Sequence, residues 1–577
     1  MTDKTEVSEQ RCSVNGCDLE IYPPHEECIL HCGKSTDGHH YQGFPSERDE
    51  FIKELKIYIS KEKETVISKE TVNTFIYLKN IYFPRPDYQG NNYIRLLDQI
   101  QQIYFDCCHF YGRELELKKE VFFDECKFHN KWSLFDYKLL KNADNVIYAH
   151  CTFEEDVVFE SAEYKGINDL SQSQFNYYCK FEGQLKINNA IIKKNIFNDN
   201  QNNFLDNNFG SEIIFNGCTF EDNQELYLSY NDKTDFLFND CYFGKKLKIR
   251  SVEEGDYEEQ QNNKTKLKSL KLINCNADES DYLRIGFLEV ENFELSNLRL
   301  PKNAELNIGD CHFKNFKLTN FRNIGKFKLY KINILKRKDI DETSNNEEFQ
   351  IDNTSIGKTD FQSVKLDSFA RVIMFDNIFP EVDYTNVQWE REIEVGQYGF
   401  EDIKVRVKNK ESICKIAYEM FNSSTRIAKK RDTYRTLKNV MIRNNDQQEA
   451  LVFYTQEMKE HRKITLKNNG LLSIDRITLA FNYWTNEFGL NWWRPVWLLI
   501  IFSIVFYGLL LCSFSDGYNS EYWQNFFEFL NPTHKTEFIA GECWGFWSYT
   551  IDFSFRIIEG LFIHQTIQAF RKYSRKL

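Results

Sequence analysis

The chain has 577 residues, enough for several domains, and a formal net charge of -13. An acidic balance of this size excludes a general nucleic-acid-binding surface, which needs cations to neutralise phosphates. The 50 Phe and 31 Tyr, set against only 9 Pro and 25 Gly, exclude a disordered chain. The rings must therefore be buried in a regular fold.

The N-terminal region predicts a small metal site. Residues 1–10 are polar and lack the apolar run of a signal peptide, so we expect a cytosolic body with reduced cysteines. Two closely spaced pairs of cysteines have the spacing of structural zinc sites: Cys12, Cys17, Cys28 and Cys32. We predict that residues 10–40 form a zinc-knuckle-like segment ordered by one structural zinc ion. Nearby alternative ligands are His25, His31, His39 and His40, and four incidental cysteines in a flexible tail are the competing interpretation.

A repeated motif fills residues 101–395, after a cap or linker expected over residues 41–100. The motif is an aromatic residue, two mostly polar residues, Cys, any residue and Phe. Its cysteines are Cys108, Cys126, Cys151, Cys179, Cys218 and Cys241, with Cys275 and Cys311 in partial copies. Alternating apolar residues such as Val121 and Phe123 predict short strands. Cysteines spread over many copies cannot converge on one ion, so we predict that they are buried as small hydrophobic residues.

These repeats resemble the pentapeptide-repeat proteins and related β-helix proteins. The resemblance implies a mainly β fold, a right-handed parallel β-helix solenoid in which Cys and Phe stack in ladders along the axis. The copies diverge from the regular five-residue pattern, and charged inserts interrupt them at residues 253–266 and 336–348. Residues 361–389 are expected to form the closing coils.

A helical region follows. Ala450, Leu451, Phe453, Tyr454 and Met458 are spaced as one face of a helix, and residues 444–446 supply a turn and an N-cap. We predict a helical hairpin in residues 396–470. It resembles the connector Tyr-x-x-Leu-Lys … Ala-x-x-Phe-Tyr-x-x-Glu-Met that joins pentapeptide-repeat bodies to membrane anchors, and a simple packing cap is the alternative. Residues 471–494 are apolar and aromatic and predict a helix on the membrane surface.

The C-terminal region predicts a transmembrane helical hairpin over residues 495–570. Residues 495–514 carry no charge and as a helix would reach about 30 Å, the thickness of the hydrocarbon core. Trp492, Trp493 and Arg494 precede this span in the manner of residues at a membrane interface. Basic residues flank both spans, and the loop between them is acidic. We therefore expect a multi-pass protein of the bacterial inner membrane with both termini cytoplasmic.

The second span, residues 546–570, is more polar, and a helix lying flat on the membrane is the alternative. It contains Asp552, Arg556, Glu559 and His564, which should face a partner helix or an aqueous cavity. The spacing of Asp552 and Arg556 allows the two charges to pair on one helical face. The tail, residues 571–577, begins with Arg571 and Lys572 and is expected to act as a cytoplasmic stop.

The sequence favours binding over catalysis. It has no Gly-rich phosphate loop, no Gly-x-Ser-x-Gly motif and no His-Glu-x-x-His pair, so we predict that it is not an enzyme. The favoured function is a membrane-anchored scaffold that binds a protein partner at the cytoplasmic face. The alternative is an oligomeric channel-like or membrane-perturbing protein, such as a defence effector, because the two spans resemble a two-span ion-channel module. Residues 515–545 lack a Thr-x-Gly-Tyr-Gly filter, and in this alternative a homo-oligomer would line its lumen with the polar face of the second span.

Overall fold

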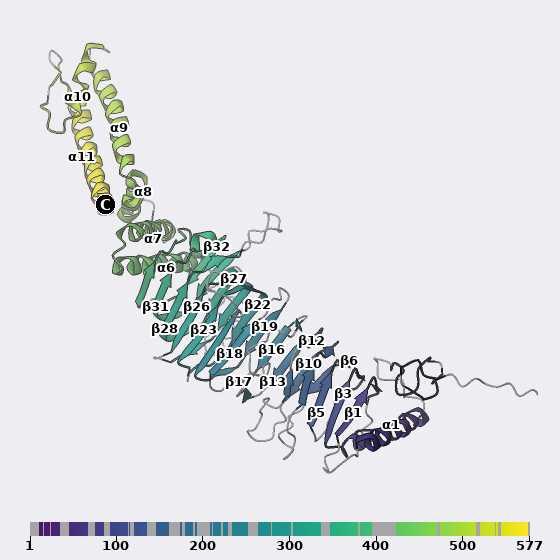
Figure 1. The fold of residues 1–577 in the computed structure, drawn as a ribbon. Helices are drawn as coiled ribbons and strands as arrows, with labels where there is room; N and C mark the ends of the chain where they lie inside the picture. Colours follow the sequence, from purple (N-terminus) through teal and green to yellow (C-terminus); the bar gives the residue numbers. More distant parts are fainter. Residues whose placement is uncertain are drawn as a thin grey trace, which may run out of the picture. The chain divides into compact units, whose positions relative to one another are not determined.

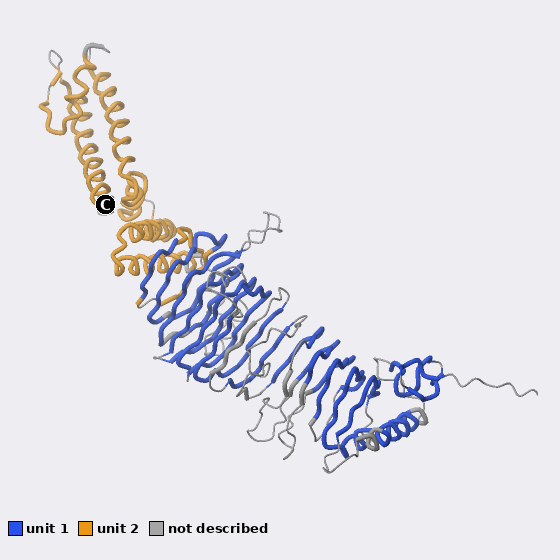
Figure 2. Tube along the Cα trace, viewed as in Figure 1, with its two compact units in different colours: residues 1–371, 382–388 blue, residues 372–381, 389–577 orange. Residues whose placement is uncertain are grey.

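The computed structural model divides the chain into two compact units (Figure 2). The first unit comprises residues 1–371 and 382–388, and the second comprises residues 372–381 and 389–577. The structure describes residues 11–15, 17–23, 25–34, 45–66, 75–85, 93–113, 115, 120–134, 146–160, 173–175, 179–188, 191–192, 208–209, 212–220, 223–228, 234–251, 264–278, 280–301, 304–335, 347–378, 381–394, 423–468, 470, 473–514, 520–536, 538–539 and 544–574.

Parallel sheets dominate the first unit (Figure 1). One sheet has the order β1 (Phe75–Lys79), β3 (Gln102–Asp106), β5 (Glu120–Asp124), β8 (Val146–Ala149) and β11 (Ser173–Phe175). A second has the order β2 (Tyr82–Phe83), β4 (His109–Phe110), β6 (Lys127–Phe128), β9 (Thr152–Phe153), β12 (Lys180–Phe181) and β15 (Asn208–Phe209). Two helices accompany these strands, α1 (Pro45–Val66) and the short α2 (Ile94–Leu97).

The remaining strands of this unit form three further sheets. The longest runs through β7 (Trp132–Leu134), β10 (Val157–Glu160), β13 (Leu185–Asn188), β16 (Glu212–Asn216), β19 (Asp235–Asn239), β22 (Thr265–Ile273), β24 (Leu288–Ser296), β27 (His312–Thr319) and β30 (Glu348–Asp352), with β29 (Asn333–Ile334) beside β27. A short sheet joins β14 (Ile191–Ile192), β17 (Thr219–Phe220) and β20 (Tyr242–Phe243). The last joins β18 (Asn223–Leu228), β21 (Lys246–Ser251), β23 (Tyr282–Gly286), β26 (Glu305–Gly309), β28 (Arg322–Tyr330), β31 (Ser355–Gln362) and β33 (Glu381–Thr385), with β25 (Arg299–Leu300) beside β28. The 3-10 helix η4 (Leu366–Ser368) also belongs to this unit, whereas all but the first residue of β32 (Arg371–Phe375) belong to the second unit.

Neighbouring strands come from successive turns of the chain. Gln102 of β3 pairs with Glu120 of β5, 18 residues later, and Lys246 of β21 pairs with Tyr282 of β23, 36 residues later. The strands pair in parallel, so each crossover returns the chain to the same end of the sheet. The turn length therefore varies by a factor of two while the register continues.

Aromatic ladders fill the interior of these turns. Phe105, Phe123 and Tyr148 occupy one register position on β3, β5 and β8. Their ring centroids are 5.0 and 4.9 Å apart, with interplanar angles of 8° and 6°. This separation matches the spacing of neighbouring strands, so rings at one position stack without displacing the backbone.

The motif cysteines lie at the corners of the turns. Where the structure describes the residue before a motif cysteine, that residue adopts a left-handed conformation, with φ of 51° at Glu125 and 52° at His150. The thiols of most motif cysteines donate to a carbonyl of the previous turn: Cys126 Sγ lies 3.5 Å from the oxygen of Phe105, and Cys151 Sγ lies 3.6 Å from that of Phe123. The predicted burial of the motif cysteines is confirmed, because all eight are at most 1% exposed: Cys108, Cys126, Cys151, Cys179, Cys218, Cys241, Cys275 and Cys311.

The prediction of a mainly β, right-handed β-helix solenoid is wrong. In the part of the chain that the structure describes, about 36% of residues are helical and about 34% are in strands. The strands form several parallel sheets and no closed solenoid. The repeats misled the prediction because copies of one motif join different sheets: Phe123 lies in β5, whereas Phe215 lies in β16 of another sheet.

The second unit is helical. Its elements are α6 (Ser423–Arg443), α7 (Gln447–Asn468), α8 (Ile474–Asn486), η5 (Glu487–Gly489), α9 (Trp493–Cys512), η6 (Ser520–Asn525), α10 (Phe526–Phe529) and α11 (Phe546–Ser574). Helices α6 and α7 lie in the segment where we expect a helical hairpin. Asn445 turns the chain with φ of 60°, and Asp446 Oδ1 accepts from the Glu449 amide at 3.1 Å as an N-cap.

A buried charge cluster joins α6 to α7. The Glu457 side chain is 7% exposed and lies 2.8 Å from Arg435 Nε and 2.7 Å from Lys438 Nζ. Burial alone would raise the pKa of Glu457, but the hydrogen bonds from Lys438 and Arg435 outweigh it and lower this pKa. Tyr434 of α6 also accepts from the Ile393 amide at 3.1 Å, which ties the helices to residues 389–394 of the same unit.

The prediction of two membrane spans is also wrong. Among the described residues only α9 is long and apolar enough to cross a bilayer. This finding does not fit a multi-pass inner-membrane protein with both termini cytoplasmic. Helix α11 covers residues 546–570, but Asp552, Arg556 and Glu559 make it too polar. Lys572 of the predicted cytoplasmic stop contacts protein groups: its Nζ donates to the Phe488 carbonyl at 3.3 Å and lies 4.7 Å from the Tyr454 ring centroid.

The aromatic ladder should dominate the stability of the first unit. Replacing Phe123, which is 2% exposed, with Ala should lower the free energy of unfolding by about 3–5 kcal/mol, because it leaves a cavity between two stacked rings. Phe122→Ala on the same strand is the matched control, since this ring stacks on Tyr104 at the opposite face of β5 and is only partly buried. Chemical denaturation monitored by circular dichroism measures both. Equal losses for the two variants would contradict the ladder's role.

Candidate functional site

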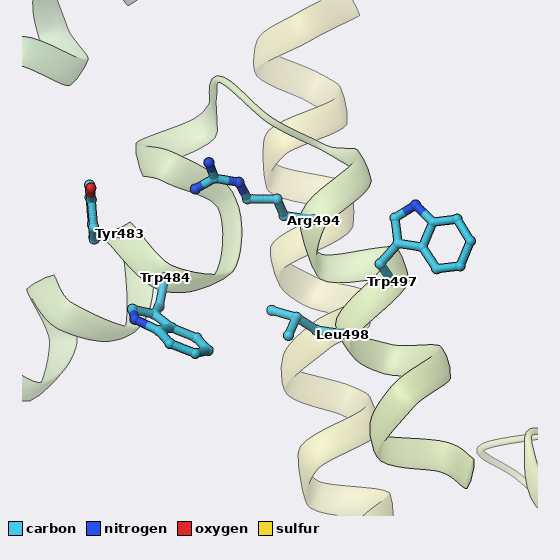
Figure 3. A pocket seen from close by; sticks show the side chains of 5 residues that line it. All are labelled: Tyr483, Trp484, Arg494, Trp497 and Leu498. Carbon is cyan, nitrogen blue, oxygen red and sulfur yellow. The ribbon is translucent and has the colours of Figure 1, made fainter.

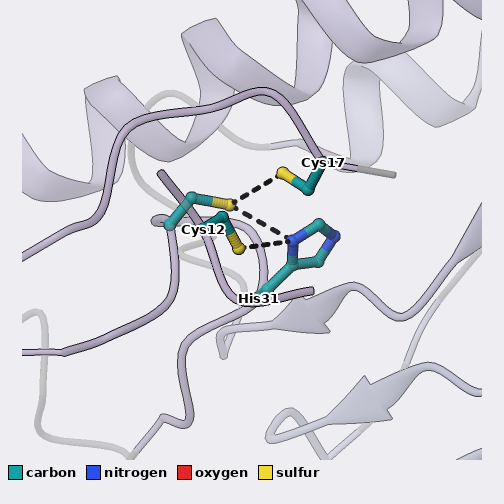
Figure 4. Close-up of side chains that lie close together, drawn as sticks. Cys12, Cys17 and His31 are labelled. Carbon is teal, nitrogen blue, oxygen red and sulfur yellow. Dashed lines mark hydrogen bonds between the residues drawn. The ribbon is translucent and has the colours of Figure 1, made fainter. Parts of the chain in front are cut away.

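Two tight turns place four metal-binding side chains near the N-terminus. In the first, the Cys17 amide bonds to the Val14 carbonyl at 3.1 Å, and the Cys12 amide bonds to the Leu19 carbonyl at 3.0 Å. In the second, the His31 amide bonds to the Cys28 carbonyl at 3.0 Å. Each turn therefore supplies two side chains, and the turns face each other (Figure 4).

The four donor atoms surround one point. The Nδ1 atom of His31 lies 3.4 Å from Cys12 Sγ and 3.3 Å from Cys28 Sγ, and the Cys17 and Cys28 sulfurs are 3.7 Å apart. All four atoms lie within 4.8 Å of one another. Cys12, Cys28 and His31 are buried, and Cys17 is half-buried. This cluster could hold a metal ion.

The fourth ligand differs from the predicted set of four cysteines. Cys12, Cys17 and Cys28 come together as expected, but His31, one of the named alternatives, takes the place of Cys32. The Cys32 sulfur instead accepts a hydrogen bond from Lys34 Nζ at 2.9 Å. Both residues lie about one helical turn after Cys28, so spacing alone does not choose between them.

Burial disfavours the charged forms of three of these side chains. It raises the pKa of the Cys17 and Cys28 thiols and lowers the pKa of the His31 imidazole. A neutral imidazole is already a competent ligand, whereas each thiol must lose its proton to bind. Three thiolates and one imidazole would fill a tetrahedral ion completely, so the arrangement is of the closed, structural type.

The cysteine segment is attached to the beginning of the sheets. The Tyr82 amide of β2 donates to the Leu30 carbonyl at 2.8 Å, and Leu30 is fully buried. Lys34 Nζ bonds to the Ile29 carbonyl at 2.8 Å and lies 5.7 Å from the Phe51 ring centroid of α1. An ion that orders residues 11–34 would thus also fix the cover over this end of the sheets.

Comparison of the chain with protein-family models, curated proteins and solved structures found no match in any of the three searches. The class of the site therefore follows from its geometry alone: a closed cluster of three cysteines and one histidine.

Three of the four polar residues expected within the second span, Asp552, Arg556 and His564, contact other side chains. The predicted pairing of Asp552 with Arg556 is confirmed, with Asp552 Oδ2 3.0 Å from Arg556 Nε. Asp552 Oδ1 also lies 2.8 Å from His534 Nε2, and both of these side chains are almost fully buried. His534 stands 18 residues before Asp552, and no sequence pattern indicated this pair. Glu559 is buried on the same face of α11, while His564 is exposed and lies 3.2 Å from Gln568.

The predicted interface residues cluster at the start of α9. Trp492 stacks on Trp493 with centroids 4.5 Å apart and meets the Phe570 ring edge-on at 5.9 Å. Arg494 forms an ion pair with Glu487 at 3.4 Å. Arg571 is exposed near the end of α11, and Lys572 is bound as described above. Three aromatic side chains, Trp492, Trp493 and Phe570, therefore lie together at the start of α9, which is the one helix among the described residues that is long and apolar enough to span a bilayer.

The cluster predicts a clear difference between two cysteines. Cys28→Ser should weaken metal binding roughly 100-fold or more because it removes a buried ligand, whereas Cys32→Ser should leave the affinity unchanged. Titration of the full-length protein with Co²⁺, followed by thiolate charge-transfer absorbance, measures both. If Cys32→Ser lowers the metal affinity as much as Cys28→Ser does, the four-cysteine site is correct and the site with His31 is not.

Proposed function

We propose that this chain is a membrane-associated scaffold: α9 attaches it to a lipid bilayer, and the parallel sheets present a binding surface to a protein partner. The observation that carries the proposal is the apolar surface of α9. Its 20 residues bear no charge after Arg494, and Trp497, Ile501 and Val505 are each more than half exposed. Leaving such a surface in water is unfavourable, and a helix of this length suits a bilayer about 30 Å thick.

A binding role accords with the sheets. Parallel turns joined by continuous backbone hydrogen bonds form a rigid support for side chains on their outer faces. The net charge of -13 favours a partner with a basic surface. We propose binding rather than catalysis because the sequence lacks the nucleophile, phosphate-loop and metalloprotease motifs named above.

We further propose that the N-terminal cluster holds a structural zinc ion. In a tetrahedral zinc site with ordinary bond lengths, two sulfurs lie about 3.8 Å apart, and sulfur and nitrogen about 3.5 Å. The separations of 3.7, 3.4 and 3.3 Å are close to these values. Zinc accepts a mixture of thiolate and imidazole ligands in a closed site. The ion would stabilise the turns of residues 11–34, which have few apolar residues of their own.

Membrane association should depend on the exposed face of α9. Full-length protein synthesised without cells in the presence of phosphatidylcholine vesicles should float with the vesicles in a density gradient. The double variant Ile501→Arg and Val505→Arg should remain at the bottom, because each buried arginine costs about 2.5–3.5 kcal/mol near the bilayer centre.

Two exposed isoleucines outside α9 provide the matched control. Ile57→Arg on α1 combined with Ile442→Arg on α6 adds the same charge and should float normally. A wild-type chain that stays at the bottom overturns the proposed attachment. If binding of the protein instead causes ion flux across the membrane of vesicles loaded with an ion-sensitive dye, the channel-like alternative is favoured over the scaffold.

Removing the metal should loosen the N-terminal segment alone. Chelation of the full-length protein should raise the rate of tryptic cleavage after Lys34 roughly tenfold, because this lysine is held by the Ile29 carbonyl and the Cys32 sulfur. Cleavage after Arg443, in the turn between α6 and α7, serves as the internal reference and should not change. Equal acceleration at both sites would indicate general unfolding and contradict a local role for the ion.

A further inference from the structure

Two cavities of opposite character in the second unit share Tyr483 of α8 as a lining residue. The first has a volume of about 320 Å³ and is lined mainly by charged side chains of α6 and α7: Lys430, Lys459, Glu460, Arg462 and Lys463, with Glu392 at its edge. The second has a volume of about 350 Å³ and is lined by Tyr483 and Trp484 of α8 and by Arg494, Trp497 and Leu498 of α9 (Figure 3).

The first cavity carries an excess of positive charge. Four cations and two carboxylates line it. Lys463 pairs with Glu460 at 2.7 Å, and Lys459 pairs with Glu487 at 3.1 Å. Arg462 has no such partner among the residues that the structure describes, and its buried Nε–H has no acceptor there. An anion in this cavity would satisfy that donor and offset the surplus charge.

The second cavity has a mainly apolar lining. Trp484 and Trp497 are 71% and 59% exposed, which is unusual for such large rings in a soluble helix pair. Arg494, at the start of α9, is the one charged residue among its described lining residues. This composition is that of a membrane interface, where aromatic rings meet both lipid chains and headgroups.

Tyr483 lines both cavities and connects them. The Arg462 guanidinium carbon lies 4.4 Å from the Tyr483 ring centroid, so the cation that faces the first cavity packs directly on the ring that borders the second. A ligand that lies over Tyr483 and occupies both cavities would place a negatively charged headgroup beside Arg462 and an apolar chain beside Trp484.

We propose that these cavities form one binding site for a phospholipid with an anionic headgroup. The headgroup phosphate accepts hydrogen bonds from Arg462 and is attracted by Lys430, and an acyl chain lies over Tyr483 against Trp484 and Trp497. This inference deepens the proposed membrane association and relies on it for the supply of lipid. It also runs against the net charge of the chain, which by itself would repel an anionic lipid.

Native mass spectrometry of the full-length protein in non-ionic detergent tests the site. Titration with phosphatidylglycerol should show one lipid bound more tightly than the rest, and phosphatidylcholine should bind about tenfold more weakly. Arg462→Gln should weaken phosphatidylglycerol binding about tenfold. Arg426→Gln, the same substitution at an exposed position of α6 outside both cavities, should bind as the wild type does.

Trp484→Ala tests the apolar half. It should weaken phosphatidylglycerol binding severalfold without affecting folding, because the ring is largely exposed. If Arg462→Gln fails to fold by circular dichroism, Lys430→Gln takes its place with the same expectation. Equal binding of both lipids, or no effect of Arg462→Gln, overturns the proposal. Full displacement of the lipid by inorganic phosphate, with Trp484→Ala binding normally, overturns it in favour of a phosphate site.

The two membrane proposals fail separately. Binding in detergent does not require α9 to enter a bilayer, so Ile501→Arg with Val505→Arg should bind phosphatidylglycerol as the wild type does. If the wild type does not float with vesicles, the attachment through α9 fails. If it floats but shows no preference for phosphatidylglycerol in detergent, only the lipid site fails.

Discussion

The pairing of each strand with the equivalent strand of the next turn is the constraint on which the first unit depends. Parallel pairing saturates the backbone and sets side chains at one position about 4.8 Å apart along the sheet. Only side chains that tolerate that repeat can occupy the interior. Flat rings stack at this distance, and a small thiol at most of the corners reaches a carbonyl of the previous turn. The abundance of Phe and the regular placement of Cys therefore both follow from the distance between neighbouring strands.

A sheet built in this way has ends that must be covered. β2 is the last described strand of its sheet, and its Tyr82 amide would lack an acceptor without Leu30. The cover is a short segment with little apolar area, and the cluster of three cysteines and one histidine within it could hold a metal ion that would stabilise it. The N-terminal cysteines and the repeats, which look unrelated in the sequence, therefore serve the same sheets.

Sequence patterns predicted what depends on local chemistry and missed what depends on distant partners. The motif indicated correctly that its cysteines are buried, and the spacing of Asp552 and Arg556 indicated their pairing. The motif could not indicate which sheet a copy joins, because that depends on the length of the preceding segments, as the separate sheets of Phe123 and Phe215 show. The choice of His31 over Cys32 depends on side-chain direction within one turn. The polarity of α11 was visible, but its buried partner His534 was not.

The variable length of the turns has a consequence for how the chain folds. Each strand needs only its predecessor as a template, and the pairs given above are separated by 18 to 36 residues however long the chain becomes. The entropy of closing each loop grows only with the logarithm of its length, so a longer insert slows the addition of one turn without blocking the next. During synthesis, the N-terminal cysteine segment and the first strands leave the ribosome before α9. The sheets can thus grow from a closed end, turn by turn, while the apolar helix is still to be made.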